Sequence, residues 1–235
     1  MKNKNSIFRL IIITIFVVIY TSCNDGGGNQ ITEPSDPNNE KLSNCDYDGR
    51  GTPLDVTNPA PKSWSGKIEV NNDDATYYII SNWANKVNIF LDDNKGEIRL
   101  NLETAITKDD NNNYWCLGAG YFEDDKLTVQ PSTYKFVVEF DSETNILDFS
   151  RKISGNDAVV GIVVRNENGD VVSFFGDTFY SKAKLELTPD DDTKSGTFKS
   201  VATPNNNDNL LKPSKKFQTY EKEVISMDKV RYLSY

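Results

Sequence analysis

The sequence predicts an all-β fold and, within that class, an antiparallel β-sandwich of short strands. Between residues 64 and 188, apolar and polar residues alternate at a period of two, and clusters of Asn, Asp and Gly interrupt the runs. No segment of this range sustains the 3.6-residue period of an amphipathic helix. Short alternating runs bounded by turn residues are typical of half-buried antiparallel strands, and they predict about ten to fourteen strands here.

The first half of this range contains a hairpin pattern. Residues 87–91 and 97–102 each put three aliphatic side chains on one face, and a polar turn at residues 92–96 separates the two runs. Two alternating runs joined by a short turn predict a hairpin. Residues 64–70 and 76–80 are rich in β-branched and aromatic residues, so they predict two strands before it.

The second half continues in the same way to the C-terminus. An Asn-Gly pair at residues 168–169 favours a tight hairpin between residues 158–164 and 170–175. Residues 221–235 suit either two strands or one amphipathic helix, and their β-branched residues favour the strands. The other predicted strands are residues 114–122, 126–129, 134–140, 146–149 and 181–188.

A series of hairpins also suits a second architecture, the lipocalin-like up-and-down β-barrel. The two architectures differ in whether the sheet closes on itself. The loops of this chain vary in length, and its glycines do not recur at the spacing of barrel corners. We therefore prefer the sandwich.

The N-terminus has the pattern of a secretion signal that ends at a cysteine. Residues 2–9 are basic and polar, residues 10–20 are apolar, and small residues precede Cys23. This is the order of a signal peptide, and its apolar core is shorter than the roughly 20 residues of a membrane span. The stretch YTSC, residues 20–23, resembles the lipobox of bacterial lipoproteins, with Tyr20 where that family prefers Leu, Val or Ile.

The resemblance implies a lipid-anchored protein from which residues 1–22 are removed and in which Cys23 carries the lipid. Residues 23–44 are rich in Gly, Pro, Asn and Asp, so they predict a flexible tether. A single β-rich domain is expected over residues 45–235. These features together are similar to the small lipoproteins of Bacteroidetes-type bacteria, which implies an outer-membrane location on either the cell-surface or the periplasmic face.

The charge and the residue inventory exclude several functions. The chain has 26 basic and 35 acidic residues, and loss of residues 1–22, with three basic residues and no acid, changes the net charge from -9 to -12. Nucleic-acid binding requires a basic surface, so no nucleic-acid partner is expected. Histidine is absent, which removes histidine-based catalytic triads and imidazole metal sites. We expect no enzymatic activity and no cofactor.

Two cysteines remain if Cys23 is lipidated. In an oxidising compartment, Cys45 and Cys116 are an even pair that can form a disulfide between the start of the domain and the strand at residues 114–122. The alternative is two separate thiols, with Cys116 buried as a small hydrophobic residue and Cys45 loose.

Three tryptophans are candidates for a ligand-binding surface. Trp83 lies in a polar stretch between two predicted strands, flanked by Asn82 and Asn85, and is therefore expected to be exposed. Exposed rings pack against the C–H face of a sugar while amides bind its hydroxyls, so Trp83, with Trp64 and Trp115, predicts a glycan site. The alternative is that these rings belong to the core.

Acidic residues recur in pairs and triplets, which are a source of oxygen ligands for Ca²⁺. None of these clusters has the spacing of an EF-hand loop, and Asp clusters also suit solvated turns and sheet edges. We therefore predict no metal site. The clusters are Asp46 and Asp48, Asp73 and Asp74, Asp109 and Asp110, Asp124 and Asp125, and residues 190–192.

These observations together predict a lipid-anchored cell-envelope protein with a non-catalytic binding domain, whose first expected ligand is carbohydrate. One alternative is a structural or adhesion protein that recognises a protein partner through an exposed strand edge. The other is a lipocalin-like carrier of an apolar ligand, which requires that the sheet close into a barrel.

Overall fold

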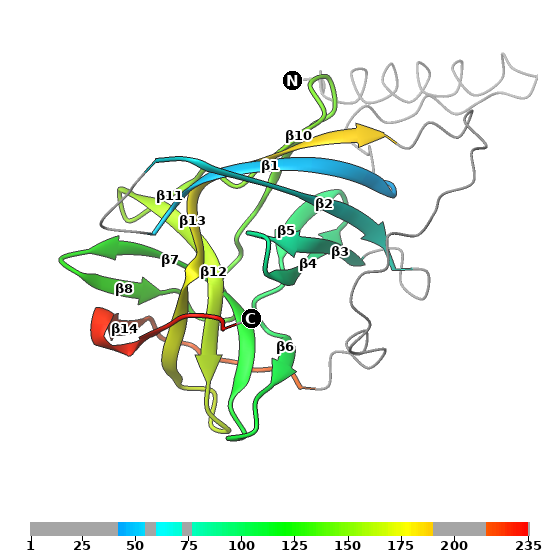
Figure 1. Cartoon of the computed structure of the whole chain (residues 1–235). Helices are drawn as coiled ribbons and strands as arrows, with labels where there is room; N and C mark the ends of the chain where they lie inside the picture. The colour runs from blue at the N-terminus through cyan, green and yellow to red at the C-terminus, as the bar shows by residue number, and fades with distance from the viewer. Residues whose placement is uncertain (1–41, 55–59, 72–76, 190–214, 235) are drawn as a thin grey trace, which may run out of the picture. The chain divides into compact units, whose positions relative to one another are not determined.

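A computed structural model describes residues 42–54, 60–71, 77–189 and 215–234 (Figure 1). The predicted signal peptide, Cys23, the tether up to residue 41 and the acidic positions 73, 74 and 190–192 lie outside the described residues. The described residues form mostly antiparallel strands with a single short 3-10 helix, in an open, sandwich-like arrangement that confirms the all-β prediction. Within these residues, no helix has the length and apolar character needed to cross a membrane.

The described strands pair in one hydrogen-bonded order, β14-β8-β7-β12-β13-β1-β2-β3-β4-β5, and the shorter strands attach beside this path. The elements in chain order are β1 (Cys45–Pro53), β2 (Lys62–Val70), β3 (Tyr77–Trp83), β4 (Val87–Asn94), β5 (Glu97–Leu100), β6 (Ala105–Lys108), β7 (Tyr114–Glu123), β8 (Lys126–Val129), β9 (Glu139–Asp141), β10 (Ile146–Asp148), β11 (Lys152–Ile153), β12 (Asn156–Arg165), β13 (Val171–Pro189), β14 (Glu223–Ser226), η1 (Met227–Lys229) and β15 (Val230–Arg231).

The longest strand, β13, connects the two halves of the sheet. Its first half pairs with β12 and, in parallel, with β15, whereas its second half pairs with β1 and β10. The two runs that the sequence predicts at residues 170–175 and 181–188 are therefore one strand. The register between β12 and β13 shifts between Val160 and Ile162 of β12. At this point the pairing partners of β13 change from those of its first half to those of its second half.

The strand β1 is central in the sheet, yet the sequence pattern does not predict it. It contains two glycines, two aspartates and a proline, which are depleted in strands. Every second residue is nevertheless buried, from Cys45 through Tyr47 to Gly49. Gly49 is needed there because a Cβ atom would lie 2.5 Å from the Trp64 indole. An inward-facing glycine adds nothing to a hydrophobic pattern, which is why the strand is hidden in the sequence.

The folded domain also begins earlier than the predicted residue 45. Leu42 is buried in the core, and the side-chain oxygen of Asn44 accepts a hydrogen bond from the Val70 backbone N–H at 2.8 Å. The last predicted tether residues, 42–44, therefore belong to the folded domain.

Two hydrophobic clusters lie on opposite faces of β12, which is buried along almost its whole length. The larger cluster contains the side chains of β1 to β5 and one face of β7, β12 and β13. The smaller cluster lies on the other face, where Phe217, Ile225 and Val230 of the C-terminal segment cover it (Figure 1). The preference for strands over a helix in residues 221–235 is confirmed by β14 and β15.

The edge of β5 is partly covered by residues 136–138. A backbone bridge joins Arg99 to Val137, and the Leu100 N–H donates to the Phe136 carbonyl at 3.0 Å. The strand predicted over residues 134–140 is thus displaced toward its C-terminal end, where β9 lies. The residues directly before this segment, 132–135, line the cleft described below.

Candidate functional site

The three tryptophans do not form an exposed platform. Trp83, which the sequence predicts to be the most exposed, is 0% exposed, and Trp64 is 4% exposed. The two ring centroids lie 5.2 Å apart in the larger cluster, and the Trp83 Nε1 donates a hydrogen bond to the Thr178 carbonyl at 3.0 Å. The prediction of an exposed Trp83 is therefore wrong.

The reason lies in the backbone around Trp83. Asn82, Ala84 and Asn85 have φ angles of 58°, 57° and 60°, and the pairing register shifts between Ile80 and Trp83. Left-handed residues on both sides of the tryptophan redirect the chain, so the ring enters the core from a polar turn. A polar neighbourhood in sequence is therefore no guide to the exposure of this side chain.

The other members of the predicted glycan site are also separated from it. Asn82 is exposed, but its amide nitrogen donates to the Ser65 carbonyl at 2.6 Å, which stabilises the turn. Asn85 is exposed beside it. Trp115 is half-buried and packs against Phe175, with ring centroids 4.5 Å apart. The sequence-predicted residues are thus not brought together as a binding surface.

The two cysteines are not joined by a disulfide. Both are buried, Cys45 in the larger cluster and Cys116 in the smaller one. Burial raises the pKa of the Cys116 thiol to about 12, so this thiol behaves as the small hydrophobic residue of the second hypothesis. The part of that hypothesis that left Cys45 loose is wrong, because Cys45 is 4% exposed.

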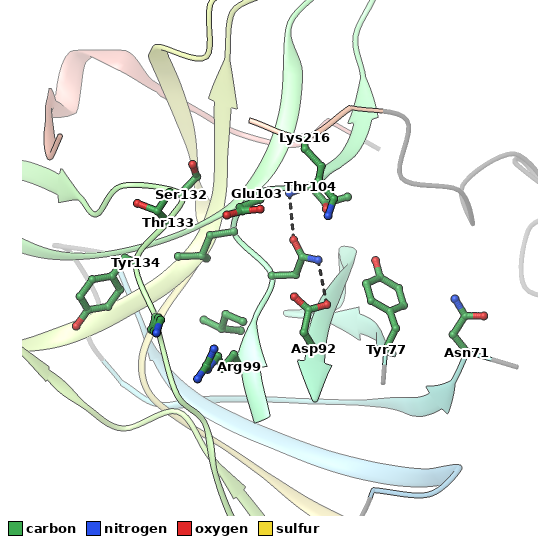
Figure 2. A pocket seen from close by; sticks show the side chains of 14 residues that line it. Asn71, Tyr77, Asp92, Arg99, Glu103, Thr104, Ser132, Thr133, Tyr134 and Lys216 are labelled. Carbon is green, nitrogen blue, oxygen red and sulfur yellow. Dashed lines mark hydrogen bonds between the residues drawn. The ribbon is translucent and has the colours of Figure 1, made fainter. Parts of the chain in front are cut away.

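A polar cleft of about 470 Å³ is the candidate functional site. One wall comes from β3, β4 and β5, the floor from the link after β5, and the opposite wall from the loop after β8 (Figure 2). Its lining residues are Asn71, Tyr77, Asp92, Arg99, Leu100, Asn101, Leu102, Glu103, Thr104, Ser132, Thr133, Tyr134, Lys135 and Lys216.

Asn101 organises the floor of the cleft. Its amide nitrogen donates to Oδ1 of Asp92 at 3.1 Å, and its side-chain oxygen accepts from the Thr104 N–H at 3.1 Å (Figure 2). Its own backbone N–H donates to the Phe90 carbonyl at 3.0 Å. Both ends of the Asn101 amide are therefore held by protein groups, and the amide links the Asp92 carboxylate to the backbone of Thr104.

Two hydroxyl groups in the cleft are buried and lack a hydrogen-bond partner among the described residues. They belong to Tyr77, which is 9% exposed, and to Thr104, which is 1% exposed. Burial, and then the negative charge of Asp92, raise the pKa of Tyr77, so its hydroxyl keeps its proton as a donor. Buried polar groups are almost always hydrogen-bonded, so these two hydroxyls are exceptions among the polar groups of the cleft.

The C-terminal segment joins the floor of the cleft to the wall formed by the loop after β8. A backbone bridge connects Lys216 to Thr104, and the Phe217 N–H donates to the Glu103 carbonyl at 2.6 Å. On the wall, the Ser132 hydroxyl donates to the Phe217 carbonyl and accepts from the Thr219 N–H, both at 2.9 Å. Residues 215–219 are thus hydrogen-bonded both to the floor of the cleft and to the wall formed by the loop after β8.

The chemistry of the cleft is that of binding polar groups. Within the described residues, no group of three or more acidic or cysteine side chains is placed to hold a metal ion. A second, smaller cavity of about 210 Å³ lies over the Trp64 indole and is surrounded by charged side chains of β1 and β13. The larger cavity is polar, and the smaller one is below the roughly 300 Å³ of a ligand-carrying cavity, so neither supports the lipocalin-like carrier.

Comparison with protein-family models, with curated proteins and with solved structures finds no match for this chain.

The cleft residues are not among the sequence-predicted site residues. The sequence signal for them is weak: two polar residues, Glu103 and Thr104, directly follow the strand predicted over residues 97–102. Lys216 carries no local signal at all, because only the fold brings it to Thr104.

Proposed function

We propose that this chain is a lipid-anchored cell-envelope protein whose β domain binds a carbohydrate in the polar cleft. The observation that carries the proposal is the pair of buried, unpartnered hydroxyls of Tyr77 and Thr104. An unpaired buried polar group costs roughly 1–3 kcal/mol, and a ligand hydroxyl that bonds to it removes this cost.

The lining favours a sugar over other small polar ligands. A sugar hydroxyl both donates and accepts, and the cleft offers a donor at Tyr77, acceptors at Asp92 and Glu103, and hydroxyls that do both. The Tyr134 ring stands on the wall opposite Tyr77, with 36% of its surface exposed (Figure 2). An exposed phenol ring supplies the apolar face against which the C–H groups of a sugar ring pack.

The anchor rests on the sequence around Cys23, and the domain is taken to be non-catalytic because no catalytic spacing is found in the chain. Labelled palmitate should be incorporated by the wild-type chain and lost in Cys23→Ala. Incorporation that persists in Cys23→Ala refutes the anchor. Protease treatment of intact cells then distinguishes the cell-surface from the periplasmic face.

The binding site is tested on a glycan array with two conservative variants. Tyr77→Phe and Thr104→Val remove the unpartnered hydroxyls and keep the side-chain shape, so we expect each to weaken glycan binding about tenfold without loss of stability. Tyr232→Phe is the matched control, because Tyr232 is exposed and does not line the cleft. Absence of glycan binding by the wild-type chain refutes the proposal, and chromatography of the bound glycan reports any hydrolysis.

Adhesion to a protein partner is the second candidate, and one observation favours it. Tyr220, Val224 and Tyr232 are 78%, 63% and 69% exposed, and all three lie on the C-terminal segment. Clusters of exposed apolar side chains are typical of protein interaction sites. A pull-down from envelope extracts that loses its partner in Val224→Lys but keeps it in Tyr77→Phe favours adhesion over glycan binding.

A further inference from the structure

We infer that the carbohydrate bound in the cleft is acidic and that Lys216 binds its anionic group. The inference rests on the proposed function and adds the ligand class and the residue that distinguishes it. The anionic group is a carboxylate such as that of a uronic acid.

The first support is the charge of the cleft relative to the whole protein. The lining contains three basic residues, Arg99, Lys135 and Lys216, against two carboxylates, Asp92 and Glu103. The chain as a whole has 26 basic and 35 acidic residues. Since Arg99 is paired with Glu97, the remaining charges of the cleft balance, which makes the cleft less repulsive to an anionic ligand than the acidic protein as a whole.

The second support is the state of each charged group. Arg99 is already paired with Glu97, and Asp92 accepts a hydrogen bond from Asn101. Lys135 and Lys216 have no ion-pair partner among the described residues. The ammonium groups of Lys135 and Lys216 are therefore available to a ligand. The carboxylates of Asp92 and Glu103 keep their negative charges and accept hydrogen bonds from sugar hydroxyls.

The third support is the position of Lys216. Its backbone is held beside Thr104 by the bridge between the two residues and by the hydrogen bond from the Ala105 N–H to the Lys215 carbonyl at 3.0 Å. Figure 2 shows the two side chains at the same end of the cleft. A sugar whose hydroxyl bonds to Thr104 thus places a neighbouring carboxylate within reach of the Lys216 ammonium, which supplies three donors.

Isothermal titration calorimetry with a matched pair of ligands tests the inference. The acidic ligand is an oligogalacturonate, and the neutral ligand is the same oligosaccharide after reduction of its carboxyl groups to alcohols. We expect the wild-type chain to bind the acidic form about three- to fivefold more tightly, with a preference that weakens as salt is added.

Lys216→Gln should remove most of the preference for the acidic over the neutral form, whereas Lys216→Arg should keep it. Lys229→Gln, an exposed lysine outside the cleft, is the control and should keep it as well. Equal affinity for the two forms overturns the inference and leaves the proposed function in place. Binding of neither form, together with an array that shows no glycan ligand, overturns both.

Discussion

The Arg165 guanidinium lies in the smaller core with 1% of its side chain exposed, and its Nη1 donates to Oε1 of Glu223 at 2.9 Å. The same nitrogen donates to the Gly169 carbonyl at 2.7 Å, and Oε2 of Glu223 accepts from the Val171 N–H at 2.5 Å. Glu223 is the first residue of β14, so this ion pair attaches the C-terminal segment to the hairpin of β12 and β13.

Removal of the glutamate charge should therefore destabilise the whole domain. Glu223→Gln leaves a buried guanidinium without its counter-ion, and we expect the free energy of unfolding to fall by about 2–4 kcal/mol. The double variant Arg165→Met with Glu223→Leu should lose less than the sum of the single losses, because neither charge is then left alone. Urea denaturation of the wild type, the two single variants Arg165→Met and Glu223→Leu, and the double variant measures the coupling energy between the two residues. Losses of unfolding free energy that are strictly additive contradict the ion pair.

Trp83 should stabilise the protein rather than bind its ligand. Trp83→Phe leaves the buried Thr178 carbonyl without its donor and opens a void, so we expect a loss of about 2–4 kcal/mol. Trp115→Phe is the control, because the Trp115 Nε1 is buried with no partner among the described residues. The free energy of unfolding should fall by less than about 1.5 kcal/mol in Trp115→Phe. Similar denaturation midpoints for the two variants would show that the Trp83 hydrogen bond has no such role.

Cys45 and Cys116 should resist alkylation until the protein unfolds. Both side chains are buried, and the pKa of Cys116 is raised to about 12 by burial, so little thiolate forms at pH 8. In the Cys23→Ala chain, iodoacetamide should add no mass to the native protein and two adducts in urea. The result should be the same with and without reductant. Two adducts that appear in urea only after reduction would show a disulfide between the two cysteines.

Alkaline pH should weaken the fold through Tyr78. Burial, followed by the charge and the hydrogen bond of Asp93, raises the pKa of Tyr78 to about 12, whereas an unfolded tyrosine ionises near pH 10. Between these values the unfolded chain loses a proton that the folded chain keeps, so stability is complete below about pH 10 and falls as the pH rises toward 12. Burial also raises the pKa values of Tyr47, Tyr77 and Tyr180, so Tyr78→Phe should reduce the slope of this dependence without abolishing it in urea titrations at fixed pH. If the fall of the unfolding free energy with pH is the same in Tyr78→Phe as in the wild type, Tyr78 does not cause it.

Much of the strand pattern follows from the sequence because alternation is a local property. The hairpin of β4 and β5 and the hairpin of β12 and β13 form where period-two runs and turn residues predict them. In these elements, the side chains that alternate along the chain are the ones that meet the core. The absence of histidine and the acidic composition are equally direct statements of the sequence.

The tertiary structure decided the features that depend on contacts between distant segments. Trp83 is buried because left-handed residues turn it toward Thr178, 95 residues away. Gly49 faces the core because the Trp64 indole occupies the space that a side chain at residue 49 would need. The cleft forms where the C-terminal segment joins Thr104 to Ser132. No local pattern in residues 215–219 predicts that these residues pair with Thr104 and Ser132. The sequence by itself thus determined the strands and their faces, while long-range packing determined which polar groups remain available to a ligand.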